Sequence, residues 1–165
     1  MGDDRPTPSD VLAAAAVAAV LSGAPSTAHA LLTRTNPLEA SLAAGTLLLP
    51  CEERASRLLP AAALAHAALS LGWAVVLAAI LPRRRTTLPA AAAGLAIAAL
   101  DLGVVGRRFP RIRALPPGPQ ILDHIAYAVT VGMVLERRAD RSTAAAVSPP
   151  SRAARAARRA RGPAA

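Results

Sequence analysis

Long runs of small and apolar residues alternate with short charged segments along this chain, and the alternation predicts helices that cross a membrane. The runs 11–32, 58–81 and 88–106 contain 22, 24 and 19 residues, and Asp101 is the only formal charge within them. A helix rises about 1.5 Å per residue, so runs of this length match a hydrocarbon core of about 30 Å. A fourth predicted helix opens at Pro119 or Gln120 and ends near Arg138.

The first apolar run contains helix-breaking residues. Gly23 and Pro25 predict a kink or break within residues 22–27. An alternative interpretation is a secretory signal peptide, with 11–21 as its apolar region and Ala28-His29-Ala30 as its cleavage site. The acidic residues before it oppose this interpretation, since signal peptides begin with positive charge. Whether 11–30 is cleaved or forms a first transmembrane helix stays open at this point.

A short helix is predicted between the first two long runs. Asn36-Pro37-Leu38-Glu39 has the features of a helix start, with Asn36 as the cap and Glu39 able to complete a capping box. Only about 13 apolar positions, or about 20 Å of helix, follow before Pro50, which is too short to span a bilayer. We therefore expect 37–50 to form an interfacial or re-entrant helix, although a fifth span is the alternative.

The predicted fold is an all-α integral membrane bundle of four transmembrane helices plus this short helix. Its organisation is a polar N-terminus (1–10), a helical transmembrane domain (11–138) and an Arg/Ala-rich tail (139–165) that is predicted to be disordered.

Composition supports the membrane class. Hydrophobic residues form 53% of the chain, aromatic residues only 2%, and 43 residues are alanine, so the helices are rich in small side chains. Intrinsic disorder of most of the chain is excluded, because it requires low hydrophobicity. The single cysteine, Cys51, excludes an internal disulfide and a cysteine-based metal site. No metal or cofactor is expected.

All 19 basic residues are arginine, and they predict the orientation. In the four-helix arrangement, 12 arginines lie on the side of both termini and seven on the other side. The positive-inside rule therefore places both termini in the cytoplasm, with the protein in the plasma membrane. The expected partners are the bilayer, anionic lipid head groups, and a membrane protein or a second copy, but not nucleic acid. The arginines expected to contact lipid phosphates are Arg83, Arg84, Arg85, Arg137 and Arg138.

Five polar residues inside apolar helices are the candidate site: His29, His66, Asp101, Asp123 and His124. Because antiparallel helices alternate in direction, all five are predicted to lie in the same half of the membrane. Asp101 is the costly member, since a carboxylate in hydrocarbon requires a partner, and His66 is the predicted one. Asp123 and His124 lie near a helix start and are expected to act as interfacial anchors.

Two functions follow from this cluster. In the first, Asp101 only holds helices together; in the second, it relays protons or ions with a histidine. No nucleotide-binding, metalloprotease or serine-hydrolase motif is present, so no enzymatic activity is expected. The leading prediction is a non-enzymatic accessory or interaction protein of the membrane, and the alternative is a small transporter or proton-linked permease that uses an intramembrane Asp/His pair.

Residues 22–27 (Ser-Gly-Ala-Pro-Ser-Thr) followed by Asn36-Pro37-Leu38-Glu39-Ala40 resemble the opening of uncharacterised small multi-pass membrane proteins of high-GC actinobacteria. The resemblance covers roughly residues 8–138. It implies a bacterial inner-membrane protein, and it assigns neither an activity nor a catalytic residue.

Overall fold

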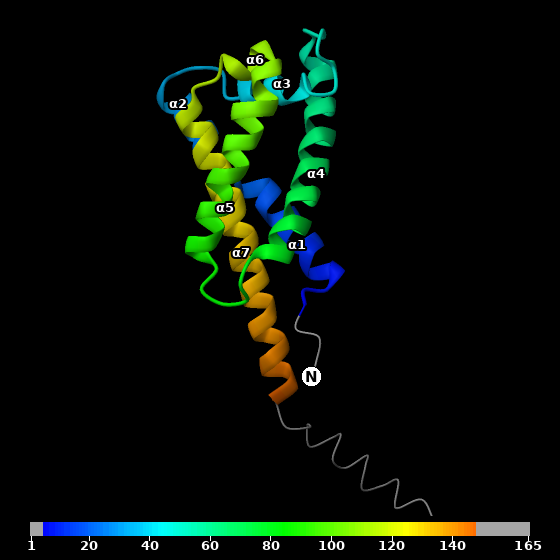
Figure 1. Cartoon of the computed structure of the whole chain (residues 1–165). Helices are drawn as coiled ribbons and strands as arrows, with labels where there is room; N and C mark the ends of the chain where they lie inside the picture. Colours follow the sequence, from blue (N-terminus) through cyan, green and yellow to red (C-terminus); the bar gives the residue numbers. More distant parts are fainter. Residues whose placement is uncertain (1–4, 148–165) are drawn as a thin grey trace, which may run out of the picture.

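The computed structural model describes residues 5–147, which form helices joined by short connections and contain no strand. In chain order the helices are α1 (Pro8–Leu21), α2 (Ala24–Leu32), α3 (Glu39–Gly45), α4 (Ala55–Ile80), α5 (Thr87–Leu100), the π-helical turn η1 (Asp101–Val105), the 3-10 turn η2 (Gly106–Arg108), α6 (Pro110–Arg113) and α7 (Pro117–Val147). Figure 1 shows α1–α2, α4, α5–η1 and α7 running alternately up and down, with α3 and α6 together at the upper end.

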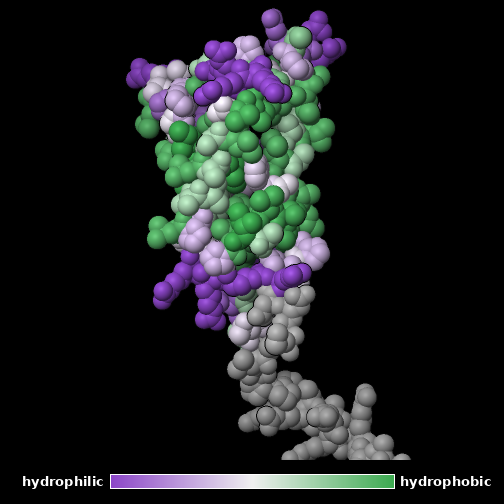
Figure 2. All heavy atoms as spheres, in the orientation of Figure 1, coloured by the Kyte–Doolittle hydropathy of each residue, from purple (hydrophilic) through white to green (hydrophobic). Residues whose placement is uncertain are grey.

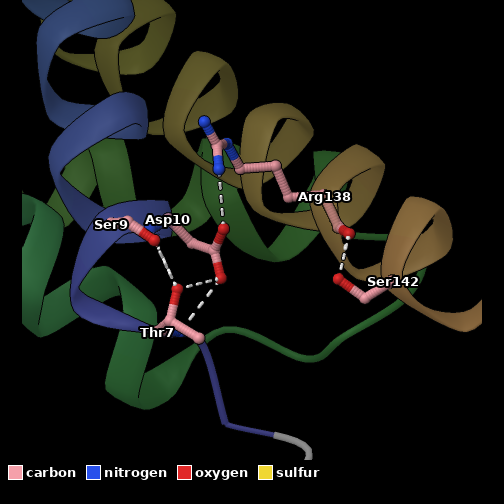
Figure 3. Close-up of polar contacts among 5 residues, drawn as sticks. All are labelled: Thr7, Ser9, Asp10, Arg138 and Ser142. Atoms are coloured by element: carbon pink, nitrogen blue, oxygen red, sulfur yellow. Dashed lines mark hydrogen bonds and ion pairs between the residues drawn. The ribbon is translucent and has the colours of Figure 1, made fainter. Parts of the chain in front are cut away.

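An ion pair joins the start of α1 to α7 at the lower end of the bundle. Arg138 donates to Asp10 Oδ1 at 2.9 Å, and Asp10 also completes a capping box with Thr7 (Figure 3). The capping box satisfies backbone N–H groups that have no partner within the first turn of α1. The start of α1 and the Arg138 region of α7 therefore lie on the same side, as the helix count predicts.

Three segments are long and apolar enough to cross a membrane: Pro8–Leu32, Ala55–Ile80 and Thr87–Arg108. Three such segments are found among the described residues where four were predicted; α7 does not meet this criterion by itself, because Asp123 and His124 interrupt its apolar stretch. Instead α7 is the central helix of the bundle, and α1, α2, α4 and α5 all pack against it. The polar residues of α7 therefore face neighbouring helices. The helix has no continuous apolar surface such as an independent span would need.

The predicted break in the first segment is present. Helix α1 ends at Leu21 and α2 begins at Ala24, with Pro25 in its first turn. The short third helix is also present, but it begins at Glu39 and contains seven residues. The predicted capping box at its start is wrong. Asn36 Oδ1 accepts from the Leu38 N–H, whereas the Glu39 carboxylate binds Arg111 on α6.

Arg111 holds α6 to α3 through two hydrogen bonds to the Glu39 carboxylate. Its Nε donates to Oε1 at 2.7 Å and its Nη2 donates to Oε2 at 3.1 Å. These bonds to the guanidinium hold the pKa of Glu39 below its usual value of 4.5.

This ion pair predicts a pH dependence of stability. A carboxyl group whose pKa is lowered by folding contributes stability above the pKa of the unfolded chain, and the contribution disappears as pH falls through the folded pKa. We expect Glu39→Gln to lower the melting temperature of the detergent-solubilised protein at pH 7. As pH falls through the folded pKa of Glu39 and its carboxyl becomes protonated, the two melting temperatures should converge. A difference that persists undiminished at low pH would contradict a role for the Glu39 charge.

Most buried hydrophobic residues of the bundle are small, and most of the large aliphatic ones are on its outer surface, although Leu58, Leu77 and Val131 are fully buried. Eleven of the buried hydrophobic residues in the described chain are alanine, including Ala14, Ala18, Ala74 and Ala128. In contrast, 22 large hydrophobic side chains are exposed. Figure 2 shows the result on one face of the molecule: an apolar band crosses the middle, and hydrophilic residues collect above and below it. A water-soluble protein buries its large apolar residues, so this distribution is the reverse of the soluble pattern.

Helix α7 continues beyond its predicted end at Arg138 to Val147, so the predicted disorder of 139–165 is wrong for residues 139–147. Alanine has the highest helix propensity, and it supports this extension without apolar burial. The hydroxyls of Ser142 and Thr143 also donate to carbonyls four residues earlier. Residues 148–165, which hold the rest of the predicted tail, lie outside the described residues.

Candidate functional site

Two of the predicted polar residues form hydrogen bonds with backbone groups on either side of the break between α1 and α2. A helix break inside an apolar environment leaves backbone groups without partners, and each such group costs several kcal/mol when water is absent. The ring Nε2 of His66, from α4, donates to the Ala19 carbonyl at 2.9 Å. On the other side of the break, Asp123 Oδ1 from α7 accepts from the Ser26 N–H at 2.9 Å. His66 and Asp123 thus act as caps supplied by neighbouring helices.

Asp101 lies at the centre of a second group, which joins three helices. Its Oδ2 accepts from the indole Nε1–H of Trp73 on α4 at 3.2 Å. The same oxygen lies 3.3 Å from Nε2 of His124 on α7. The other ring nitrogen of His124, Nδ1, lies 2.7 Å from the Gln120 carbonyl oxygen. The side chains of Asp101 and His124 are 23% and 21% exposed, so the pair is largely enclosed but not sealed.

The backbone changes its helical pitch at Asp101. Residues 101–105 form a π-helical turn, in which the Gly106 N–H donates to the Asp101 carbonyl five residues earlier. Single π turns inside α-helices occur frequently at functional sites, because the widened turn redirects the side chains around it. This turn marks Asp101 as a special position in the last part of the third long helix.

Tyr127 provides a further polar bond between the central helix and α4. Its hydroxyl donates to the carbonyl of Ser70, and its ring belongs to the buried core together with Ala74, Leu77 and Val131. A buried tyrosine requires such a partner for its hydroxyl. The central helix therefore reaches α2, α4 and η1 through three different polar side chains within residues 123–127.

The structure brings most of the predicted cluster together, but with different pairings. Asp101 pairs with His124 and not with His66, because Trp73 rather than His66 lies on α4 within reach of Asp101. His29 is half-buried, and its side chain forms no hydrogen bond with the described residues. Asp123 and His124, which were predicted to be interfacial anchors, contact Ser26 on α2 and Asp101 on η1.

Sequence reasoning missed three members of this cluster: Trp73, Ser26 and Tyr127. A partial signal for Trp73 exists, because it follows His66 by seven residues and such a spacing places both side chains on one face of a helix. Ser26 contributes only its backbone N–H, and no sequence pattern distinguishes it from its neighbours.

At the lower end of the bundle, some of the arginines predicted to contact lipid bind acidic residues of the chain, and others have exposed side chains. Arg138 is bound to Asp10. Glu136 accepts from the backbone N–H of Arg85 at 2.8 Å, and its Oε2 accepts from the Thr86 hydroxyl at 2.8 Å, so it caps the start of α5. The side chains of Arg84 and Arg137 are exposed at this same end.

In the described range 5–147, no three His, Cys, Asp or Glu side chains are grouped so that they could hold a metal ion. Comparison with protein-family models, curated proteins and solved structures finds no match to this chain.

Proposed function

We propose that this chain is an integral membrane protein that crosses the bilayer four times, through α1–α2, α4, α5–η1 and α7. The observation that carries the proposal is the outward display of large aliphatic residues: Val20, Leu32 and Leu88 are each more than 80% exposed. In a bilayer these side chains contact acyl chains, and small residues allow the helices to approach closely. The resemblance noted above favours a bacterial plasma membrane.

Helix α7 crosses as part of the bundle rather than as an independent span. Asp123, His124 and Tyr127 would each be costly in hydrocarbon, but each forms a hydrogen bond to another segment of the bundle. Membranes tolerate polar side chains when these face the interior of a bundle and form hydrogen bonds there.

Orientation depends on the last part of the chain. The described residues place seven arginines at each end of the bundle: Arg5, Arg83, Arg84, Arg85, Arg137, Arg138 and Arg141 below, and Arg34, Arg54, Arg57, Arg107, Arg108, Arg111 and Arg113 above. Five more arginines follow within residues 152–161 and give the lower end its excess. By the positive-inside rule, the lower end with the C-terminus is cytoplasmic.

The native Cys51, which is exposed in the upper connection, tests this orientation directly. In intact cells we expect a membrane-impermeant maleimide to label Cys51 from outside. It should label Arg84→Cys, in a Cys51→Ser background, only after permeabilisation. Labelling in the opposite pattern would overturn the proposed orientation, and a protein absent from the membrane fraction would overturn the membrane assignment.

A deletion of 148–165 extends the same experiment. The shortened chain should still enter the membrane and keep its melting temperature, because the described bundle contains all the bonds given above. Its balanced arginines should then produce a mixed orientation, seen as partial labelling of Cys51 in intact cells. Labelling identical to that of the full chain would show that the tail does not set the orientation.

Within the membrane, we propose a non-enzymatic accessory or interaction role. His66, Asp123 and Tyr127 support this role, because each forms a hydrogen bond with another helix. The apolar outer faces also support it, since a partner helix or a second copy could cover them. A proton-linked permease is the second candidate, and the Asp101–His124 pair favours it.

Reconstituted vesicles distinguish the two candidates. Purified protein is placed in vesicles that contain a pH-sensitive dye, and a pH gradient is imposed. An accessory protein leaves the gradient as stable as in protein-free vesicles. A permease dissipates it faster, and Asp101→Asn removes the difference because an amide does not titrate.

A further inference from the structure

We infer that Asp101 and His124 form a proton-binding site, which holds one proton in the hydrogen bond between Asp101 Oδ2 and His124 Nε2. This proton-binding site extends the second candidate function, the proton-linked permease. Any role of the site in transport rests on that proposed function. Binding itself is argued from the atoms of the pair, and it is tested without a transport measurement.

The first step concerns the hydrogen on His124. Its Nδ1 lies 2.7 Å from the carbonyl oxygen of Gln120, and a carbonyl oxygen can only accept a hydrogen bond. Nδ1 must therefore carry a hydrogen. A neutral imidazole has one N–H, so Nε2 of neutral His124 carries a lone pair.

The second step concerns Asp101. An ionised carboxylate is also an acceptor only, so Oδ2 of ionised Asp101 and Nε2 of neutral His124 would present lone pairs to each other. Their 3.3 Å contact becomes a hydrogen bond when one further proton lies between them. That proton is carried either by Nε2, as an imidazolium–carboxylate pair, or by Oδ2, as a carboxylic acid and imidazole. Both forms have no net charge.

The charge balance favours the occupied site. Adding one proton from water converts a carboxylate and a neutral imidazole, with a net charge of −1, into a neutral pair. Release of the proton restores the charge of −1 within the apolar band, where an uncompensated charge is costly. The indole N–H of Trp73 donates to the same Oδ2 in both states, so it orients the carboxylate without supplying the exchangeable proton.

A hollow of about 210 Å³ at the upper end of the bundle is lined by Leu102, Arg113 and Gln120 among others. Leu102 follows Asp101 directly, and the carbonyl of Gln120 binds His124.

Other titratable groups lie on the central helix and on the helices that pack against it. Helix α7 contributes Asp123 and Tyr127, α4 contributes His66, and α2 contributes His29. The acidic residue of α1, Asp10, is at the opposite end, bound to Arg138. Because Asp123 accepts from Ser26 and His66 donates to Ala19, neither lies in the hydrogen bond that holds the inferred proton.

Trp73 is the only tryptophan of the chain, so its fluorescence reports on this site alone. We expect the emission of the purified protein in detergent to change with pH in a single transition that follows the binding of one proton. Asp101→Asn should abolish the transition, because an amide does not titrate. His124→Gln leaves the Asp101 carboxyl beside Trp73 but removes its partner, so it should shift the transition to a different pH. Asp123→Asn, the matched control on α7, should retain it. Circular dichroism identifies any variant that fails to fold.

The inference is overturned if the emission is constant between about pH 4 and 10, the range that covers carboxyl and imidazole titration. It is also overturned if the transition persists in folded Asp101→Asn, or if it is unchanged in folded His124→Gln. A transition with the expected dependence, combined with vesicles that keep their pH gradient, supports proton binding and rejects the permease candidate. The two proposals can therefore fail independently.

Discussion

Gly94→Ala is expected to destabilise the bundle by about 1–3 kcal/mol, the usual cost of adding a methyl group to a well-packed interior. Helices α5 and α7 cross closely at this glycine. A Cβ built on Gly94 would lie 2.7 Å from the Ile125 Cα and 2.8 Å from the His124 carbonyl oxygen. Both are backbone atoms, which cannot rotate away, so the helices themselves must separate. That separation would also lengthen the contact between Asp101 and His124.

Gly72 on α4 provides the matched control, because a Cβ at that position would meet no atom within 4 Å. Alanine is the better helix former, so Gly72→Ala should leave stability unchanged or raise it by up to about 1 kcal/mol. The measurement is the free energy of unfolding in mixed detergent micelles, followed by circular dichroism. Equal effects at the two positions would contradict the close crossing of α5 and α7.

Asp123→Ala should cost about 1–3 kcal/mol or more, because it leaves the Ser26 N–H at the start of α2 without its acceptor. The lower limit applies if water reaches the break, and the cost increases if the break lies in hydrocarbon. Asp123→Asn retains an acceptor oxygen at the same position, and we expect it to restore most of the stability.

Asp140, an exposed carboxylate farther along the same helix, supplies the control for Asp123. Replacing it with alanine should change the unfolding free energy by less than about 0.5 kcal/mol, as is usual for surface positions. Thermal unfolding of the three variants in one detergent gives the comparison. A loss of stability in Asp123→Asn as large as that in Asp123→Ala would show that charge, rather than a hydrogen-bond acceptor, is required at this break.

The site was only partly predictable for a physical reason. An ionisable residue in an apolar run demands a partner, so Asp101 and His66 are identified from sequence as residues that must be paired. The identity of the partner depends on helix rotation and on the local pitch. At Asp101 the pitch changes through a π turn, which no periodic pattern of this alanine-rich segment reveals. Pairing by residue type alone therefore favoured His66 over Trp73 and His124.

The sequence by itself determined the all-helical class, the order of the long helices, the break at Gly23–Pro25 and the shortness of the 37–50 segment. These features follow from local properties: the length of apolar runs, the conformational limits of proline, and the charges between runs. Only the tertiary structure decided that α7 is the central helix and that large side chains face outward around an alanine interior. Alanine and leucine both count as apolar in a sequence pattern, so which of them faces a neighbouring helix emerges only when the helices pack.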